Sequence, residues 1–188
     1  FIMATTIATP NVTPMAAPVE ATSTVSDISF LHVQGQQIVD GDGNPVILRG
    51  VNMDTFYYLY RWDPDVIQDY GTKDDIKLLA EMGANVIRLG LHWRYFEDGI
   101  CYELIDRYLE WCRANDIYVV LDMHIVPGDD YVLDGFIWDD PAAQQHLVEL
   151  WAEIARHYHN EPIIAGYDIY NEPEPDDPAR WWELARQT

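Results

Sequence analysis

Basic residues are scarce in this sequence of 188 residues, which has 11 lysines and arginines against 32 aspartates and glutamates and a formal net charge of −21. A surface of this sign repels phosphate backbones and anionic lipids, which argues against nucleic acid or a membrane surface as a partner. The sequence also lacks any apolar run near the roughly 18 residues needed to span a membrane. An uncharged partner suits this composition, and the acidic surplus can also serve solubility alone.

Cysteine is scarce too, since the sequence holds only Cys101 and Cys112. Both fall within one segment of helical periodicity, where the helical rise would separate them by about 16 Å. That distance is too long for a disulfide, so we expect two unpaired thiols with no chemical role.

The N-terminal part of the sequence has no basic residue before Arg49 and no helical or strand periodicity before residue 30. Residues 1–26 are rich in Thr, Ala and Pro and carry one charged side chain, Glu20. We therefore predict a leader or linker over residues 1–29 and a folded domain over residues 30–188. A signal peptide with a basic first segment is not visible, and processing or an incomplete N-terminus would account for this.

Strand and helix patterns alternate from residue 30 onward. A β-hairpin is predicted over residues 31–39. Apolar strand segments are predicted at residues 46–51, 85–89, 117–123 and 163–170. Amphipathic helices are predicted at residues 74–82, with Thr72 as N-cap, at residues 102–115 and 141–158, and from about residue 178. This alternation predicts an α/β fold with a parallel sheet and right-handed crossovers.

Two parallel α/β architectures fit this pattern, a doubly wound open sheet and a (β/α)8 TIM barrel. Doubly wound nucleotide-binding proteins carry a glycine-rich turn after an early strand. The first predicted strand instead runs into Gly50-Val51-Asn52-Met53-Asp54, and the chain contains neither a GxGxxG nor a Walker motif. The barrel is therefore favoured. Since a full barrel needs about 250 residues, we expect a partial barrel of about four β/α units preceded by the hairpin.

Polar residues stand at the C-terminal ends of the predicted strands. Arg88 lies near the end of the second strand, His124 follows the third, and Asn171 and Glu172 follow the fourth. Pro173 ends the last ladder, because it has no N–H to donate. In a barrel these ends meet at one mouth, so we expect these side chains around one pocket. The structural alternatives are a buried ion pair for Arg88 and a hydrogen-bonded core histidine for His124.

Four motifs occur in the order and at the separations of a known family. They are Arg49-Gly50-Val51-Asn52, Asn85-Val86-Ile87-Arg88-Leu89, Leu121-Asp122-Met123-His124 and Tyr170-Asn171-Glu172-Pro173. Together they resemble glycoside hydrolase family 5, a cellulase-like family of retaining barrel glycosidases, over residues 31–188. The resemblance implies an O-glycosyl hydrolase without a metal or organic cofactor, acting on a β-linked polysaccharide or oligosaccharide.

The resemblance also implies roles for the residues at the mouth. Glu172 matches the general acid/base, which protonates the leaving glycosidic oxygen and then deprotonates the incoming water. Asn171 matches the residue that hydrogen-bonds the sugar 2-hydroxyl and the nucleophile. Arg88 matches the arginine that keeps the nucleophile ionised, and His124 matches a histidine that binds substrate.

Tryptophans are candidate sugar platforms, since an indole ring can stack on the C–H face of a sugar. Trp93 and Trp138 fall in predicted loops at the strand ends and are therefore candidate substrate-binding residues. Trp151 lies on a predicted helix and is expected in the core. Trp181 and Trp182 are neighbours on the last helix, so only one of them can face inward.

A retaining glycosidase needs a second carboxylate about 5 Å from the first. The family carries this nucleophile on its seventh strand, whereas this sequence ends soon after the fourth predicted strand. We therefore expect the N-terminal half of a catalytic domain, inactive on its own. A polymer substrate and the Thr/Pro/Ala-rich leader favour an extracellular location.

Two other functions stay open at the level of sequence. A metal-dependent barrel hydrolase could use His92, Asp122, His124 and Glu172, although the His-x-His pair usual after the first strand of such enzymes is missing. A non-catalytic half-barrel that only binds carbohydrate is the other alternative, and its open strand edges predict poor solubility or dimerisation. The sequence does not distinguish glucan from mannan.

Overall fold

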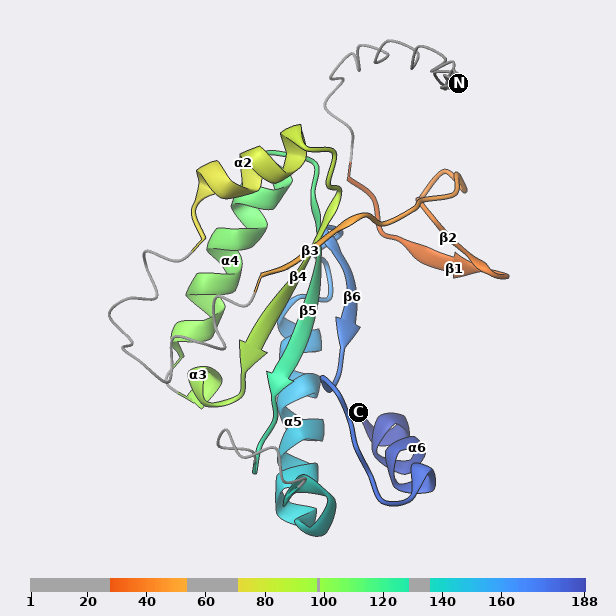
Figure 1. Ribbon diagram of the computed structural model, residues 1–188, viewed down its shortest axis with the longest axis vertical. Coiled ribbons are helices and arrows are strands. Elements are labelled where there is room, and N and C mark those ends of the chain that lie inside the picture. The colour runs from red at the N-terminus through yellow and green to blue at the C-terminus, as the bar shows by residue number, and fades with distance from the viewer. Residues whose placement is uncertain (1–27, 54–70, 98, 129–135) are drawn as a thin grey trace, which may run out of the picture.

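The computed structural model describes residues 28–53, 71–97, 99–128 and 136–188, so most of the predicted leader lies outside the described residues. It contains an antiparallel hairpin and a four-stranded parallel sheet with helices around it (Figure 1). The elements in chain order are β1 (His32–Gln34), β2 (Gln37–Val39), β3 (Gly50–Met53), α2 (Lys73–Glu81), β4 (Val86–His92), α3 (Arg94–Glu97), α4 (Ile100–Arg113), β5 (Tyr118–Ile125), η2 (Phe136–Asp139), α5 (Pro141–His157), β6 (Ile164–Asp168) and α6 (Pro178–Gln187).

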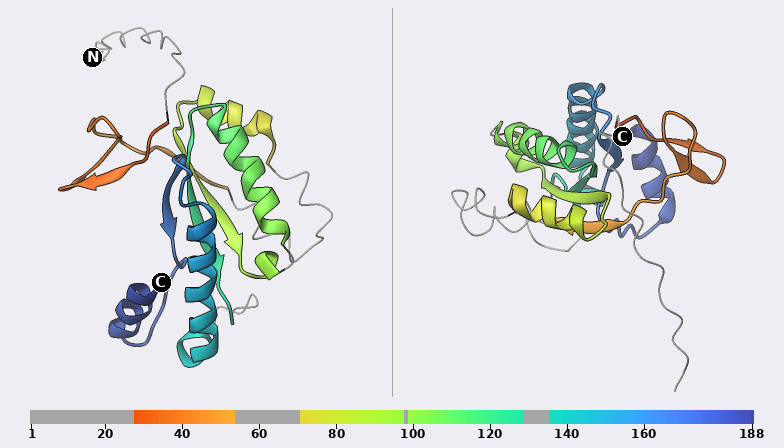
Figure 2. Two further views of the ribbon diagram at one scale, coloured as in Figure 1. Left: turned by 180° about the vertical axis from the view of Figure 1, so that it is seen from behind. Right: turned by 90° about the horizontal axis from the view of Figure 1, so that it is seen from above.

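The order of the strands in the sheet decides between the two candidate architectures. It is β3-β4-β5-β6, the same as the order in the chain, and every neighbouring pair is parallel. A doubly wound sheet reverses its strand order at a switch point, whereas a barrel wall adds strands in sequence. Helices α4 and α5 lie along the same face of the sheet (Figure 2). The prediction of a partial barrel is confirmed.

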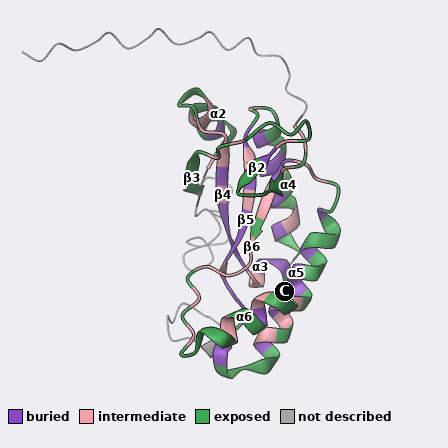
Figure 3. Cartoon of the chain, turned by 90° about the vertical axis from the view of Figure 1, so that its right-hand side faces the viewer, coloured by how far each residue is buried: buried purple, intermediate pink, exposed green. Residues whose placement is uncertain are grey.

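The core lies between the sheet and these two helices. Alternate residues of β4 and β5 face the helices, as the two-residue period of a strand requires. The fully buried apolar residues that these two strands turn to the helices are Ile87, Leu89, Leu91, Val119, Leu121 and Met123. They pack with the buried residues of α4 and α5, including Tyr108, Leu109 and Cys112 of α4 and Leu147, Trp151 and Ile154 of α5. Figure 3 shows this burial on the central strands and the inner sides of the helices.

Helix α2 begins where the sequence predicts and buries less than expected. The Thr72 hydroxyl accepts from the Asp75 N–H while the Asp75 carboxylate accepts from the Thr72 N–H, which forms a capping box. Only Ile76 of its apolar residues is fully buried, and Leu78 and Met82 are 54% and 75% exposed. The reason is position, because α2 precedes β4 and lies over the side of the sheet that ends at β3, an edge strand among the described residues.

The first parallel strand starts later than predicted. The sequence predicts it over residues 46–51, whereas the ladder begins at Gly50, opposite Val86. The Asn85 side chain occupies the preceding stretch, since its Oδ1 accepts from the Arg49 N–H at 2.7 Å and its Nδ2 donates to the Ile47 carbonyl at 3.0 Å. A Cβ at Gly50 would stand 1.6 Å from the Val86 carbonyl oxygen, so only glycine allows the two strands to approach here.

Both cysteines are buried and unpaired on α4, as predicted. Burial raises the pKa of the Cys112 thiol to about 12 and the pKa of Cys101 well above its ordinary value. We expect a thiol reagent to modify neither cysteine in the folded chain and both in guanidinium chloride. Because the thiols ionise near pH 9 only after unfolding, the free energy of unfolding should fall as pH rises from about 9 towards 12. Rapid labelling of the folded chain would contradict this packing.

None of the helices in the described part of the chain is both long and apolar enough to cross a membrane.

Candidate active site

The carboxyl ends of β4, β5 and β6 lie together at the lower end of the sheet in Figure 1. The register places Asp122 of β5 beside Asp168 of β6, and Arg88 of β4 one layer earlier, beside Val120. Directly paired residues of neighbouring strands point to the same face, and this face is the one turned away from α4 and α5. The sheet therefore gathers one arginine and two aspartates on its open face.

Arg88 is at the centre of a polar network. Its Nε and Nη2 donate to Oδ2 of Asp168 at 3.0 and 2.8 Å, and Nη2 also donates to Oδ1 of Asn171 at 2.9 Å. Its Nη1 lies 2.9 Å from Oδ2 of Asp122. The guanidinium is thus held on three sides by groups from β5, β6 and the segment after β6. Arg88 thus forms the ion pairs that the sequence analysis gave as the alternative to a functional role, and it also lies at the strand ends where the site is predicted.

The network determines how His124 and Asn171 present their polar atoms. His124 Nδ1 lies 2.8 Å from Oδ2 of Asp122, and an ionised carboxylate can only accept, so Nδ1 carries the proton. In the neutral ring Nε2 is then an acceptor, and it lies 3.4 Å from Nδ2 of Asn171. Since Oδ1 of Asn171 is engaged by Arg88, the amide turns its N–H donors to the other side. Asn171 is therefore a donor at this site.

Burial and charge act in opposite directions on Asp122. Its side chain is fully buried, and this desolvation raises the pKa of the carboxyl, while the hydrogen bond from His124 and the charge of Arg88 oppose the rise. Arg88 carries one positive charge against the carboxylates of Asp122 and Asp168.

The segment that carries Asn171 and Glu172 is fixed by backbone and aromatic contacts. The Trp151 indole N–H donates to the Ile169 carbonyl at 2.9 Å, and the Asn171 N–H donates to the Met123 carbonyl at 3.2 Å. The Tyr170 ring lies 5.8 Å from Trp138 and 6.3 Å from Trp181, measured between centroids. These contacts join the segment to β5, η2, α5 and α6.

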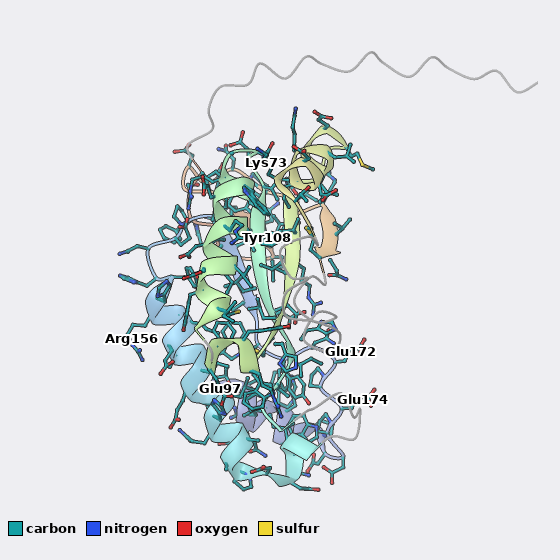
Figure 4. The ribbon with its side chains drawn as sticks, turned by 90° about the vertical axis from the view of Figure 1, so that its left-hand side faces the viewer. Lys73, Glu97, Tyr108, Arg156, Glu172 and Glu174 are labelled. Carbon is teal, nitrogen blue, oxygen red and sulfur yellow. The ribbon has the colours of Figure 1, made fainter. Side chains whose placement is uncertain are left out.

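Glu172 occupies an unusual backbone conformation. Its φ is +47°, in the left-handed region, where a non-glycine residue costs about 1–3 kcal/mol, and Pro173 restricts the preceding residue further. The side chain is exposed and makes no hydrogen bond or ion pair with any described residue. Figure 4 places it on the side of the sheet opposite α4 and α5. No contact of the Glu172 side chain with a described residue offsets this strain.

Because of this strain, we expect glycine to be more stabilising than alanine at position 172, the reverse of their order within a helix. Glu172→Gly should be more stable than Glu172→Ala by about 1 kcal/mol, because only glycine adopts a positive φ without cost. At Glu149, an exposed position within α5, the same pair should show the opposite order by about 1 kcal/mol. Urea titrations at equal m-values measure both differences. The same order at both positions would rule out strain at Glu172.

The predicted tryptophan platforms have different surroundings. Trp93 is half-buried, with the His146 ring 5.3 Å away and the Arg94 guanidinium 5.0 Å above its ring. Trp138 is only 5% exposed and packs against Tyr170, so it supports the site in this structure and offers little surface for a sugar. Trp151 is in the core, as predicted, and Trp181 faces inward while Trp182 is exposed.

Asp168 is the site residue that the sequence analysis missed. A signal was present, because Asp168 is a carboxylate inside the apolar run of residues 163–170, at a position that faces the same side as Asp122. Its partner could not be read from the sequence, since Arg88 lies two strands away in the sheet.

The described residues do not assemble the metal site of the alternative hypothesis. Asp122 and His124 are adjacent, but no group of three or more His, Cys, Asp or Glu side chains within residues 28–53, 71–97, 99–128 and 136–188 could hold a metal ion. His92 is buried, and its Nδ1 accepts from the Arg94 N–H at 3.3 Å. A surface pocket of about 360 Å³ lies between α4 and α5, on the opposite face of the sheet.

Known proteins resemble most of the chain. The family model for cellulase (glycosyl hydrolase family 5) matches residues 39–188. A β-xylosidase of Phanerodontia chrysosporium is 31% identical over 189 residues, covering 78% of this chain and 40% of the relative. Endoglucanase C of Acetivibrio thermocellus is 31% identical over 150 residues, covering 72% of this chain and 43% of the relative. The chain spans less than half the length of these two relatives.

A solved structure shows the same fold. The crystal structure of an endogalactoceramidase superposes with a TM-score of 0.62 at 24% identity, covering 85% of this chain and 47% of the other. At this identity the likeness concerns the fold alone, and it agrees with the sequential parallel sheet.

Proposed function

Because the chain belongs to glycosyl hydrolase family 5, we propose that it supplies the acid/base half of a retaining glycosidase site acting on a β-linked polysaccharide. The observation that carries this proposal is the strained Glu172, which directly follows an Asn171 held by Arg88 and Met123. The proposed catalytic residue is Glu172. The proposed supporting and substrate-binding residues are Arg88, His124, Asn171 and Trp93, with Trp138 as a supporting residue through its contact with Tyr170.

The chemistry proceeds in two steps. A carboxylate nucleophile bonds to the anomeric carbon while the bond to the leaving oxygen breaks, and the proton of Glu172 passes to that oxygen. Water then replaces the enzyme carboxylate at the anomeric carbon, and its proton returns to Glu172. Asn171, as a donor, suits the sugar 2-hydroxyl, whose hydrogen bonds strengthen in the transition state.

We place the nucleophile on a later strand of the barrel, beyond Thr188. A β/α unit takes about 30 residues of a 250-residue barrel, so three further units put that strand about 100 residues after Glu172. The reading frame after Thr188 tests this directly, and we expect a strand there that ends in a carboxylate. If no such carboxylate follows, the chain would be the non-catalytic carbohydrate-binding half-barrel.

The stereochemistry of the reaction tests the proposed class. We expect the protein with both carboxylates to release sugar first as the β-anomer from a β-linked glucan, mannan or xylan, which NMR can follow before mutarotation. Activity should persist in a chelator. Initial release of the α-anomer, or loss of activity with the chelator, would refute a metal-independent retaining mechanism. A polymeric substrate also supports the proposal of an extracellular protein.

A further inference from the structure

We infer that Asp168 is a positioning residue of this site, which holds Arg88 so that the Asn171 amide presents its N–H donors towards the sugar. The inference rests on the proposed function for its effect on turnover. The contact itself, between the carboxylate and the guanidinium, is a property of the folded chain.

Asp168 binds the edge of the Arg88 guanidinium that carries Nε and Nη2. Its Oδ2 accepts from both Nε and Nη2, at 3.0 and 2.8 Å, whereas Asp122 meets only Nη1. The Nη2 atom that donates to Asp168 also donates to Oδ1 of Asn171. Without Asp168, rotation of the guanidinium would remove the donor that fixes the amide.

No other contact among the described residues replaces this one. The other side-chain neighbour of the Asn171 amide is His124, and the 3.4 Å between their nitrogens exceeds the usual range of about 2.7–3.2 Å for a good hydrogen bond. The orientation of the amide therefore depends on Arg88. Asp168 accepts from two nitrogens of Arg88 and Asp122 from one, so Asp168 contributes most to the orientation of the guanidinium.

The two aspartates divide their tasks. Asp122 is fully buried and binds both Arg88 and His124, so it belongs to the packed interior. The Asp168 side chain is 39% exposed on the open face of the sheet and binds only Arg88 among the described residues. Its replacement should disturb the site more than the fold.

The test compares Asp168→Ala and Asp168→Asn with a matched control at Glu161. Glu161 pairs with Arg113 at 2.6 Å and lies just before β6, at the opposite end of that strand, so Glu161→Ala breaks a similar ion pair away from the site. In the active protein we expect Asp168→Ala to lower kcat by up to about 10²-fold with little change in KM, because a misplaced group mainly affects the transition state. Asp168→Asn keeps an acceptor oxygen and should retain more activity.

A second readout needs no activity. In the folded 188-residue chain, the side-chain amide signals of Asn171 should shift in Asp168→Ala and stay unchanged in Glu161→Ala. If the wild type proves inactive while these signals shift, the proposed function fails and the positioning role stands. Unchanged amide signals, or a lower melting temperature with unchanged kcat, would overturn the inference.

Discussion

Replacing Glu172 with glutamine should lower kcat by about 10²–10⁴-fold on glycosides with poor leaving groups, measured in the protein that carries both carboxylates. Glutamine has the same shape as glutamate and cannot donate a proton to the leaving oxygen. The loss in the first step should be much smaller with a nitrophenolate leaving group, which departs without protonation. The ratio of the two losses separates acid catalysis from a general defect.

Glu174 provides the matched control. It is an exposed glutamate of the same segment, two residues after Glu172, and Figure 4 shows both on the same side of the molecule. Glu174→Gln should leave kcat within about a factor of two of the wild type, since a carboxylate outside the reacting geometry contributes little. Equal losses at both positions, or no loss at Glu172, would remove Glu172 from the proposed role.

Replacing Arg88 with leucine should lower the free energy of unfolding by about 3–5 kcal/mol at pH 7, the largest stability effect that we expect in this chain. The reason is Asp122, which is fully buried and would keep its negative charge without a cation beside it. The control Arg113→Leu breaks a partly exposed pair with Glu161 and should cost about 1 kcal/mol or less.

The pH dependence of this loss identifies its cause. Burial already raises the pKa of Asp122, and removal of Arg88 would raise it further. A carboxyl with a raised pKa in the folded state binds its proton more tightly there, so the variant should lose stability as pH rises through the interval from the ordinary value near 3.8 to the raised pKa. The difference between variant and wild type should therefore shrink at acid pH. A difference independent of pH would assign the loss to packing.

Local patterns in the sequence predicted α2, α4, α5 and α6 well, because the signals that start and end a helix lie within a few residues, whereas the short α3 and η2 were not predicted. Thr72 caps α2, and Asp140 and Asp177 cap α5 and α6 just before a proline. The strands were less accurate at their ends. The side chain of Asn85 replaces the ladder before Gly50, and no pattern near residue 46 shows that the residue just before β4 will bind there.

The motifs alone were enough to identify the family and to indicate Arg88, His124, Asn171 and Glu172 as candidates, because a barrel wall that adds its strands in chain order brings their carboxyl ends together. The tertiary structure alone revealed that Asp168 holds Arg88, that Asn171 is oriented as a donor, and that Glu172 has a positive φ. Each of these depends on distances of about 3 Å between residues of different strands, or on one backbone angle. Composition, periodicity and spacing cannot predict such distances, because residues far apart in the chain become neighbours only when the sheet forms.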